Sequence, residues 1–423
     1  MKKRFIIYIF SLLMLTGCLE KIAQAPVLDS AVPAMANVQK NTSPSVSEEI
    51  ITTPPEGVEL KTSRPIEVYE KVMIRDVISC KGVQLRNGSQ KLDTSEIGEK
   101  SVKVSYIYKG KRYEQNISYN VSDTTAPTVL HSGDGSVVLI GESFDINKCV
   151  GFVDNYDKKP VITYTGEVDT STTGTYYLTA TAADSSGNET TWDLGIKVEA
   201  EEPEYVDDND RLPFEQLVSD YSDENVAFGI DVSKWQGEID FEAVKNAGCE
   251  FVIMRVGSYY DEYTVDAYFH SNMENAINAG LKVGVYIYTT ANTEQEVREN
   301  AQWIAEQLDG KKLDFPVVFD WEEFSNFQQY EMSINDLNEY YNIFDEELEK
   351  LGYDSMLYSS KNFLNNFWYK QSSNPVWLAH FTDETDYDGE YALWQMSCFG
   401  NIDGIEGDVD FNILYTDKAK FYE

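Results

Sequence analysis

The sequence predicts a multidomain chain in which two all-β modules precede a parallel β/α barrel. Three observations lead to this fold class. The 423 residues exceed what one ordinary domain holds. Apolar and polar residues alternate with a period of two through much of 92–200, which is typical of antiparallel sheets. From Val226 onward, short β-rich runs alternate with amphipathic helical stretches, as a barrel with crossover helices requires.

The N-terminal residues have the pattern of an export signal. A basic start and an apolar run lead into Leu15-Thr16-Gly17-Cys18, which resembles the bacterial lipobox. This resemblance implies a signal peptide over 1–17 and a lipid on Cys18, so we expect the chain at the extracellular face of a bacterial cell membrane. Leu19 follows the cysteine where lipoproteins retained at the inner membrane of diderm bacteria have another residue type, so the type of cell envelope stays open. Residues 18–60 are rich in Ala, Pro, Ser and Thr and are expected to form a disordered tether.

Two related β-rich segments follow the tether. Each contains the pattern DTSxxG and then alternating strands, once within 92–123 and once within 168–200. The second segment, from TAPTVL through FVDNYDKK to AADSSGNE, resembles the immunoglobulin-like modules of bacterial surface proteins. We therefore predict a diverged immunoglobulin-like sandwich over 61–124 and a second one over 125–200, which serve as spacers or bind the cell wall.

Two short polar segments lie within and after the second module. The loop that begins at Asp184 is interpreted as a plain Asx/Gly turn rather than as a calcium loop. Residues 201–225 are acidic and contain proline, and we interpret them as a solvated linker.

Eight β-rich runs and three helical stretches within 226–423 define the expected barrel. The runs cover 227–233, 250–257, 282–290, 315–322, 354–360, 375–381, 392–397 and 407–412. The helical stretches cover 266–280, 294–310 and 333–352, with a capping serine before the third and a glycine at the end of each. The later connections are too short for full helices, so the outer ring is expected to be incomplete.

The stretch PVVFDWEEF, residues 316–324, runs from a buried strand into three carboxylates. Side chains two apart share one face of a strand, so Asp320 and Glu322 point one way while Trp321 and Glu323 point the other. The carboxyl ends of parallel barrel strands open on one mouth. The first run ends near Asp231, and the last carries Asp408 and Asp410. We therefore expect acids from three strands to meet there.

Neighbouring carboxylates in a partly desolvated pocket raise the pKa of at least one member. A carboxyl group with a raised pKa donates a proton near neutral pH, and hydrolysis of a glycosidic bond needs such a donor for the leaving oxygen. The acid cluster therefore favours glycoside hydrolysis. Serine-hydrolase chemistry has little support, because none of the three histidines, His131, His270 and His380, lies beside a GxSxG motif. No pair of them has the spacing of metal ligands.

An ordered set of motifs strengthens this interpretation. GIDVSKWQG, FVIMRVG, GVYIYT, VVFDWE, VWLAHF, LWQ and GIEGDVDFN resemble glycoside hydrolase family 25, the lysozymes or muramidases. The resemblance implies a flattened, TIM-like barrel and cleavage of the β-1,4 bond between N-acetylmuramic acid and N-acetylglucosamine in peptidoglycan. It makes Glu322 the general acid/base and Asp320 its partner, which orients the substrate's own 2-acetamido group as nucleophile. Asp231 and Asp410 match the remaining acids of the pocket.

Aromatic and amide residues near the same strand ends are interpreted as substrate contacts. These are Tyr286, Tyr288, Trp377 and Gln395. Trp235 and Gln236 follow the first strand and are expected to pack under the site. Two positions depart from the family pattern, Met396 after LWQ and the pair His380-Phe381, and we expect both to alter subsites rather than chemistry.

Composition narrows the partners and leaves some alternatives open. The formal charge is −38 and no Lys/Arg block follows the first four residues, which argues against nucleic acid. We predict a monomer that needs no metal or cofactor. Pairing of Cys249 with Cys398 stays open. A catalytically inactive glycan-binding lipoprotein and an adhesin that acts through its β modules are the alternative functions.

Overall fold

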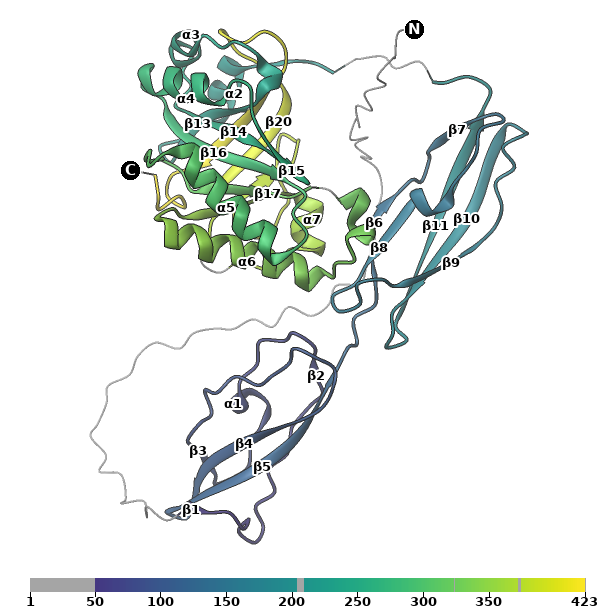
Figure 1. Ribbon diagram of the computed structural model, residues 1–423, viewed down its shortest axis with the longest axis vertical. Helices are drawn as coiled ribbons and strands as arrows, with labels where there is room; N and C mark the ends of the chain where they lie inside the picture. The colour runs from purple at the N-terminus through teal and green to yellow at the C-terminus, as the bar shows by residue number, and fades with distance from the viewer. Residues whose placement is uncertain (1–49, 204–208, 323, 372–373, 423) are drawn as a thin grey trace.

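The computed structural model describes residues 50–203, 209–322, 324–371 and 374–422, which form three folded units (Figure 1). In this view the first unit lies at the bottom, the second extends along the right, and the third lies at the upper left. The predicted signal peptide, Cys18 and most of the predicted tether lie outside the described residues. Among the described residues, no helix is long and apolar enough to cross a membrane.

The first unit contains one mixed sheet rather than the predicted two-sheet sandwich. Its elements are β1 (Ile50–Ile51), β2 (Ile66–Glu67), α1 (Ile74–Val77), β3 (Gln84–Leu85), β4 (Gly98–Tyr108) and β5 (Lys111–Ser122). The strand order is β1-β5-β4-β3, with β2 also paired to β5. Prolines and glycines interrupt residues 52–97, so this segment covers the sheet as an irregular layer with α1 instead of building a second sheet. Val102, Val104 and Tyr106 are buried between the two layers, as their alternation predicts.

The second unit has two sheets packed around an apolar core. Its elements are β6 (Thr128–Ser132), β7 (Val137–Leu139), η1 (Ile146–Lys148), β8 (Val150–Val153), β9 (Val161–Thr165), β10 (Gly174–Ala183) and β11 (Glu189–Glu199). One sheet has the order β7-β11-β10-β9, and β6 pairs with β8 in the other. Leu178, Ala180 and Ala182 face the core, whereas Tyr177 is exposed, so the predicted alternation along β10 is confirmed.

The two DTSxxG repeats form the same local turn. In the first repeat Asp93 accepts hydrogen bonds from the backbone N–H and the hydroxyl of Ser95. In the second repeat Asp169 accepts the equivalent pair from Ser171. This shared turn starts a long strand in both units, which is the structural content of the repeat.

Eight strands of the third unit close into a barrel. They are β13 (Val226–Val232), β14 (Phe251–Tyr260), β16 (Lys282–Thr289), β17 (Val317–Asp320), β18 (Ser355–Ser360), β19 (Val376–Ala379), β20 (Leu393–Asn401) and β21 (Val409–Tyr415). Two short strands lie outside the ring: β12 (Leu212–Pro213) pairs with β20, and β15 (Glu262–Val265) pairs with β14.

The expectation of an all-parallel barrel is wrong for its last strand. Neighbours from β13 through β20 are parallel, but β21 is antiparallel to both β20 and β13. Parallel pairing needs a crossover of about a dozen residues or more. Only residues 402–408 join β20 to β21, so the chain turns back at the mouth and β21 descends from it.

The helices cover the barrel unevenly, as the short later connections predict. They are α2 (Phe214–Tyr221), α3 (Phe241–Asn246), α4 (Phe269–Asn278), α5 (Glu294–Leu308), α6 (Ile334–Leu351) and α7 (Lys361–Asn366), with the 3-10 turns η2 (Lys234–Gln236) and η3 (Phe324–Tyr330). The Ser333 hydroxyl accepts from the backbone N–H of Asp336 and caps α6, which ends at Gly352 with φ of 86°. Both ends agree with the sequence prediction.

The predicted acidic linker is in part a structural element of the barrel unit. Strand β12 pairs with β20, and α2 buries Phe214 and Leu217 in the main core. Phe214 lies edge-on to Phe411 of β21 with ring centroids 5.1 Å apart. The acidic residues that surround the apolar residues within 212–221 made the whole segment resemble a linker in the sequence. The barrel unit therefore begins near Leu212 rather than at Val226.

Alternation along the strands separates the barrel interior from its helical coat. Phe228, Ile230 and Val232 of β13 face the helices, whereas Ala227, Gly229 and Asp231 face inward. A side chain at Gly229 would place its Cβ 2.3 Å from the Phe251 ring, so glycine is needed there. Apolar side chains fill the lower interior, namely Ala227, Phe251, Ile253, Val318, Met356, Leu393 and Leu414. Polar side chains occupy the end near the mouth.

The burial of α2 gives a stability prediction. Leu217→Ala should lower the free energy of unfolding of the barrel unit by about 2–5 kcal/mol, because a fully buried leucine leaves a cavity. Calorimetric unfolding of the whole chain measures this change. The exposed neighbour Gln216→Ala serves as the matched control and should leave the transition in place. An unchanged transition in Leu217→Ala would mean that this segment is a linker after all.

Candidate active site

A recess of about 190 Å³ opens at the mouth of the barrel, and all eight predicted catalytic and substrate residues line it. They are Asp231, Tyr286, Tyr288, Asp320, Glu322, Trp377, Gln395 and Asp410. Arg255, Tyr358 and Phe381 complete the lining. Strands distant in sequence thus deliver their mouth-facing side chains to one place, as the strand-end argument requires.

The two acids after β17 face the recess. Asp320 is only 5% exposed, whereas Glu322 stands at the open rim and keeps access to water. Trp321 points the opposite way, is fully buried and donates its indole N–H to the Ala291 carbonyl at 2.9 Å. The predicted alternation is therefore present in these three residues. Glu323 lies outside the described residues.

Asp410 reaches the recess for a reason different from the predicted one. It lies near the start of β21, and only the antiparallel direction of this strand brings that start to the mouth. Asp410 pairs in register with Asp231 on the neighbouring strand β13. Asp408, the other acid of this motif, is not part of the recess lining and instead forms an ion pair with Arg211 at 2.9 Å.

Two amide side chains hold the Asp231 carboxylate. Gln395 and Asn412 each donate an N–H to the same oxygen, Oδ2, at 2.9 and 2.7 Å. The other end of each amide is also fixed: Tyr358 donates its hydroxyl to the Gln395 oxygen, and Trp377 donates its indole N–H to the Asn412 oxygen, both at 2.8 Å. Since both amide oxygens accept hydrogen bonds, both amide nitrogens must face Asp231.

Burial raises the pKa of each of the four acids in the recess, and repulsion by neighbouring acids adds to the rise for Asp320, Glu322 and Asp410. Desolvation raises the pKa of Asp231 to about 6, against the opposing effect of its two amide hydrogen bonds. Glu322 keeps an open side, but desolvation of its carboxyl by the recess walls, together with the negative charge of Asp231, raises its pKa to about 7. The pKa values of Asp320 and Asp410 are raised well above the usual range of a carboxyl by burial and by the charges of neighbouring acids. Near neutral pH, therefore, Asp231 is ionised while Glu322 retains a proton in much of the population.

The Asp320 carboxyl has an unused oxygen. Its Oδ1 is buried and has no hydrogen-bond partner among the described residues. Arg255 lies close enough to oppose the rise in the pKa of Asp320, but its own hydrogen bonds go to Asp266 at 2.7 and 2.9 Å. A buried acceptor without a donor is costly, so this oxygen is available to a donor on a bound ligand.

The predicted substrate residues differ in what they offer. Tyr288 stacks on Tyr260 with ring centroids 5.4 Å apart, and Tyr286 lies edge-on to Trp377 at 6.4 Å. Trp377 and Gln395 line the recess, but they are nearly buried and their hydrogen bonds support Asp231. They therefore position the acid as well as line the recess.

Three expectations around the site need correction or completion. Trp235 does not pack under the site, because its side chain is 72% exposed with the Lys234 ammonium 5.0 Å from the ring centroid. Met396 lies on the outer face of β20 among core residues, where it cannot form a subsite, whereas Phe381 does line the recess. Cys249 and Cys398 are free thiols.

Sequence reasoning missed Arg255, Tyr358 and Asn412. The rule that side chains two apart share one face of a strand could have predicted all three, because each lies two residues after an inward-facing position. Arg255 follows Ile253, Tyr358 follows Met356, and Asn412 follows Asp410. The sequence does not show which side chains these three residues contact, because those contacts form only when the barrel closes.

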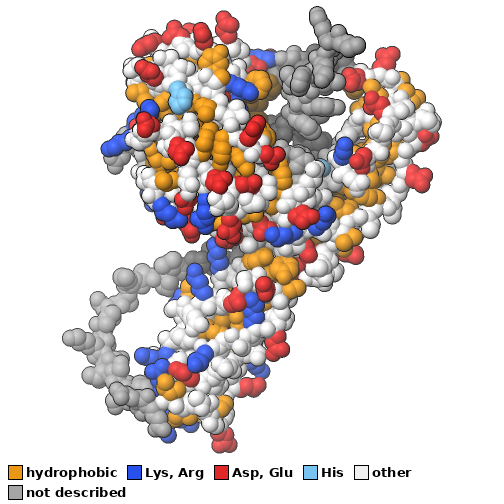
Figure 2. Space-filling model, in the orientation of Figure 1, with side chains coloured by type: hydrophobic (Ala, Val, Ile, Leu, Met, Phe, Trp, Pro, Cys, Tyr) orange, Lys and Arg blue, Asp and Glu red, His pale blue; other side chains and the backbone are white. Residues whose placement is uncertain are grey.

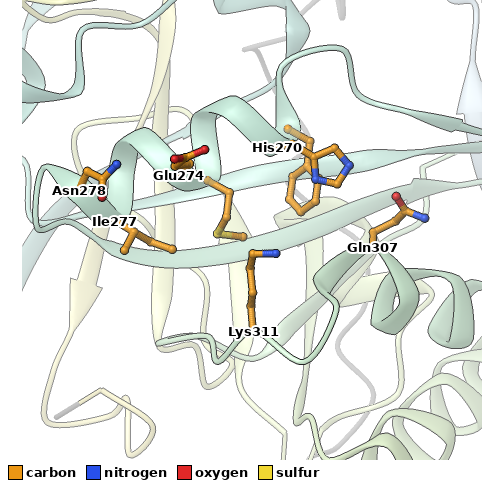
Figure 3. A pocket seen from close by; sticks show the side chains of 8 residues that line it. His270, Glu274, Ile277, Asn278, Gln307 and Lys311 are labelled. Carbon is orange, nitrogen blue, oxygen red and sulfur yellow. The ribbon is translucent and has the colours of Figure 1, made fainter.

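A larger recess, of about 310 Å³, lies outside the barrel between α4 and the end of α5 (Figure 3). His270, Glu274, Ile277 and Asn278 project from α4 toward Gln307 and Lys311. Glu274 is the single carboxylate in its lining, so this recess lacks the paired acids that glycoside hydrolysis needs. Its size alone does not make it the active site.

Comparisons with known proteins match this barrel. The family model described as Glycosyl hydrolases family 25 covers residues 230–405. Protein YegX of Escherichia coli, which is uncharacterised, is 31% identical over 193 residues, covering 44% of this chain and 68% of YegX. The chain belongs to glycosyl hydrolase family 25. A second family model, Bacterial surface protein, Ig-like domain, matches residues 129–198 in the second unit.

Named lysozymes are among the relatives of the family 25 domain. Lysozyme M1 of Streptomyces globisporus is 30% identical over 199 residues, and the autolytic lysozyme of Clostridium acetobutylicum is 30% identical over 193 residues. This chain spans 66% and 54% of their lengths, respectively, and each match covers 44% of this chain. A crystal structure of a lysozyme from Streptomyces coelicolor aligns over 47% of this chain and 98% of its own, with 25% identity and a TM-score of 0.40. The family 25 domain is a glycoside hydrolase of the lysozyme type.

The raised pKa of Asp320 gives a stability prediction for the family 25 domain. A carboxyl whose pKa is higher in the folded state destabilises the fold increasingly as pH rises above its unfolded pKa of about 4. Asp320→Asn should therefore raise the free energy of unfolding at pH 7 by about 1 kcal/mol or more, since each pKa unit is worth about 1.4 kcal/mol. Denaturant titrations at pH 7 and pH 4 measure the gain, which should shrink at pH 4.

The matched control for this gain is Asp354→Asn, at an exposed residue just before β18. It should show no pH-dependent gain in stability. A loss of stability in Asp320→Asn at both pH values would contradict the assignment of a crowded, proton-holding carboxyl.

The amide donors of Asp231 give a kinetic prediction. Asn412→Ala removes one N–H from the carboxylate, so the pKa of Asp231 should rise by about one unit, because a hydrogen bond to a charged group is worth about 1.5–3 kcal/mol. The acidic limb of the pH profile of kcat/KM for cell-wall hydrolysis should move upward by the same amount. Asn366→Ala, at an exposed residue of α7, is the control. An unmoved acidic limb in Asn412→Ala would refute this role.

Proposed function

We propose that the family 25 domain cleaves the β-1,4 bond between N-acetylmuramic acid and N-acetylglucosamine in cell-wall glycan. The observation that carries the proposal is the convergence of Asp320 and Glu322 with Asp231 and Asp410 in one recess at the barrel mouth. The names of the lysozyme relatives support the same substrate. Stretches of glycan reach the acids from the open side, where Glu322 meets solvent.

Glu322 acts as the general acid. A donor to the leaving glycosidic oxygen works best when its pKa lies near the working pH, and the pKa of Glu322 is raised to about 7. Asp231 contributes to this value through its negative charge, so it acts on the reaction through Glu322. After the bond breaks, the same carboxylate of Glu322 accepts a proton from the incoming water.

Asp320 orients the substrate's 2-acetamido group. Its unpartnered Oδ1 accepts the acetamido N–H, which directs the acetamido oxygen toward the anomeric carbon as the internal nucleophile. Donation of this N–H favours the ionised form of Asp320 and offsets the rise in pKa caused by burial. The chain therefore needs no covalent attachment of the sugar to a carboxylate.

Aromatic side chains bind the sugar rings beside the acids. The stacked Tyr288 and Tyr260 rings border one side of the recess, and Phe381 lines it as well. Trp235 follows β13 at the mouth and presents an exposed indole face. Flat apolar rings with polar edges suit the faces of pyranose sugars.

Display on the cell surface completes the proposed function. A lipid on Cys18 holds the chain at the extracellular face of the membrane, and residues 18–60 with the two β-rich units extend the enzyme toward the wall. From Val226 onward the chain has 37 acidic and 12 basic residues, and acidic side chains spread over the visible face of the barrel unit (Figure 2). Charge does not recruit such a domain to an anionic wall, so tethering raises its local concentration instead.

Two other functions remain distinct alternatives. One is a glycan-binding lipoprotein without activity, and the other is an adhesin that acts through the immunoglobulin-like units. The four recess acids with raised pKa favour the enzyme, because a binding site gains nothing from crowded carboxyls that cost stability.

Substitution of the proton donor tests the reaction itself. Glu322→Gln should lower kcat by about 10²–10⁴-fold, the usual contribution of a general acid, while glycan binding persists. Mass analysis of peptidoglycan digested by the unmodified chain should find new reducing ends on muramic acid. Equal activity of Glu322→Gln, or reducing ends on glucosamine, would refute the proposal.

Removal of the lipid site tests display. Cys18→Ala should lose most activity on intact cells, because the enzyme no longer remains beside its polymer, yet hydrolyse soluble muropeptides at the original rate. Parallel assays on cells and on muropeptides measure both. Full activity of the secreted variant on cells would show that tethering is not needed.

A further inference from the structure

A second cluster of acids lies far from the barrel mouth, in the second unit. Asp123 follows β5 in the connection to the second unit, Asp157 lies in the loop after β8, and Asp184 follows β10. One carboxylate oxygen from each of these three residues lies within 4.8 Å of the others. Asp154, at the start of the β8 loop, is close enough to raise the pKa of Asp123 through its charge.

Most of these carboxylates are buried, and some of their oxygens have no partner. Asp123, Asp154 and Asp184 are 5%, 1% and 8% exposed, respectively. Oδ2 of Asp123 and Oδ2 of Asp154 are buried without a hydrogen-bond donor among the described residues, as is Oδ1 of Asn155. Buried carboxylate oxygens are normally satisfied, so the two orphaned oxygens of Asp123 and Asp154, whose charges interact, need an explanation.

No cation of the protein compensates this charge within the described parts of the chain. The nearby Lys158 and Lys159 form ion pairs with Asp336 and Glu331 instead. The hydrogen bonds that the acids do receive come from neutral groups: Asp157 accepts from the backbone and hydroxyl of Ser185, and Asp184 accepts from the backbone and amide of Asn188. Burial and mutual repulsion accordingly raise the pKa of Asp123 to about 6 and also raise that of Asp154.

The expected Asx turn does not account for this arrangement. The loop does turn tightly at Asp184, but its carboxylate accepts from the N–H of Asn188, four residues on, at 2.8 Å, rather than from the residue two positions on as in an Asx turn. That turn uses only residues of its own loop. The Asn188 amide also donates to the carbonyls of Asp123 and Thr125, at 3.3 and 3.4 Å. These contacts hold the backbone of the preceding connection, but they give no donor to the buried Oδ2 atoms of Asp123 and Asp154.

We propose that Asp123, Asp154, Asp157 and Asp184 bind a calcium ion. Calcium takes six to eight oxygen ligands at about 2.3–2.6 Å, so two ligands on opposite sides of the ion are about 4.8 Å apart. The three grouped oxygens fit within that limit. The orphaned oxygen of Asp154, whose charge also acts on Asp123, is a further carboxylate ligand of the kind calcium prefers. Magnesium fits less well, because it demands a near-ideal octahedron and retains several waters.

The site lies where all three units of the chain meet. Tyr69 of the first unit contacts Tyr156 with ring centroids 5.8 Å apart. The Asp154 carbonyl accepts the N–H of Ile334 at the start of α6, and the Phe152 carbonyl of β8 accepts from the Gln328 amide of η3. Strand β8 and the loop after it therefore also contact the barrel unit. A bound ion therefore fixes the β8 loop, and with it the angle between the spacer units and the enzyme. This inference is independent of the proposed reaction.

Calorimetric titration of the full chain with calcium chloride, after treatment with EGTA, tests the proposal. One ion should bind per chain with a Kd of about 10⁻⁶–10⁻³ M, within the range of sensor and extracellular calcium sites. The melting temperature should rise with calcium because the ion binds only the folded chain. Magnesium chloride at the same concentrations should bind at least about tenfold more weakly.

Variants separate ion binding from a purely structural role. Asp123→Asn and Asp154→Asn should each weaken calcium binding about tenfold or more, because ligand charge sets the affinity. In EGTA their melting temperatures should equal or exceed that of the unmodified chain, since repulsion is relieved. Glu167→Gln, at an exposed acid of the same unit, is the matched control and should bind normally.

Three results would overturn the assignment. The first is the absence of calcium binding up to about 10 mM, well above the weakest extracellular sites. The second is unchanged affinity in both Asp123→Asn and Asp154→Asn. The third is a loss of melting temperature in EGTA for both variants together with no response to calcium in the unmodified chain.

Discussion

The hydrogen bonds from Gln395 and Asn412 to one oxygen of Asp231 are the constraint on which the active site depends. They limit the rise in the pKa of a fully enclosed carboxyl to about 6, so Asp231 carries its charge near neutral pH. That charge helps to keep a proton on Glu322. Tyr358 and Trp377 fix the oxygen ends of the two amides by hydrogen bonds. Side chains of the barrel strands therefore determine the protonation states of Asp231 and Glu322.

Closure of the barrel by an antiparallel strand makes this network possible. Strand β21 enters at the mouth, so Asp410 and Asn412 face the recess directly beside Asp231 and Gln395 of the flanking strands. A parallel last strand would place the same residues at the opposite end. Several buried acids at the mouth lower the stability of the barrel. The layer of apolar side chains beneath them, which includes Phe251 and Leu414, offsets this loss.

Local patterns predicted much of this molecule, and contacts between distant segments account for the rest. Alternation correctly oriented Asp320, Trp321 and Glu322, and capping residues located α6, because both depend on neighbours in sequence. The pairing of β12 with β20 and the two amide hydrogen bonds to Asp231 depend on partners more than 150 residues away. The calcium ligands were missed for the same reason, since Asp123 and Asp184 belong to different loops.

The central claim is that Glu322 holds its proton near neutral pH because its carboxyl is desolvated and lies beside the charged Asp231. A carbon-13 NMR titration of labelled glutamate carboxyls, with the signal assigned by its loss in Glu322→Gln, measures this pKa directly. The account predicts a midpoint near pH 7 in the unmodified chain and a lower midpoint in Asp231→Asn. A midpoint near the ordinary glutamate value of about 4.3, unmoved by Asp231→Asn, would contradict it.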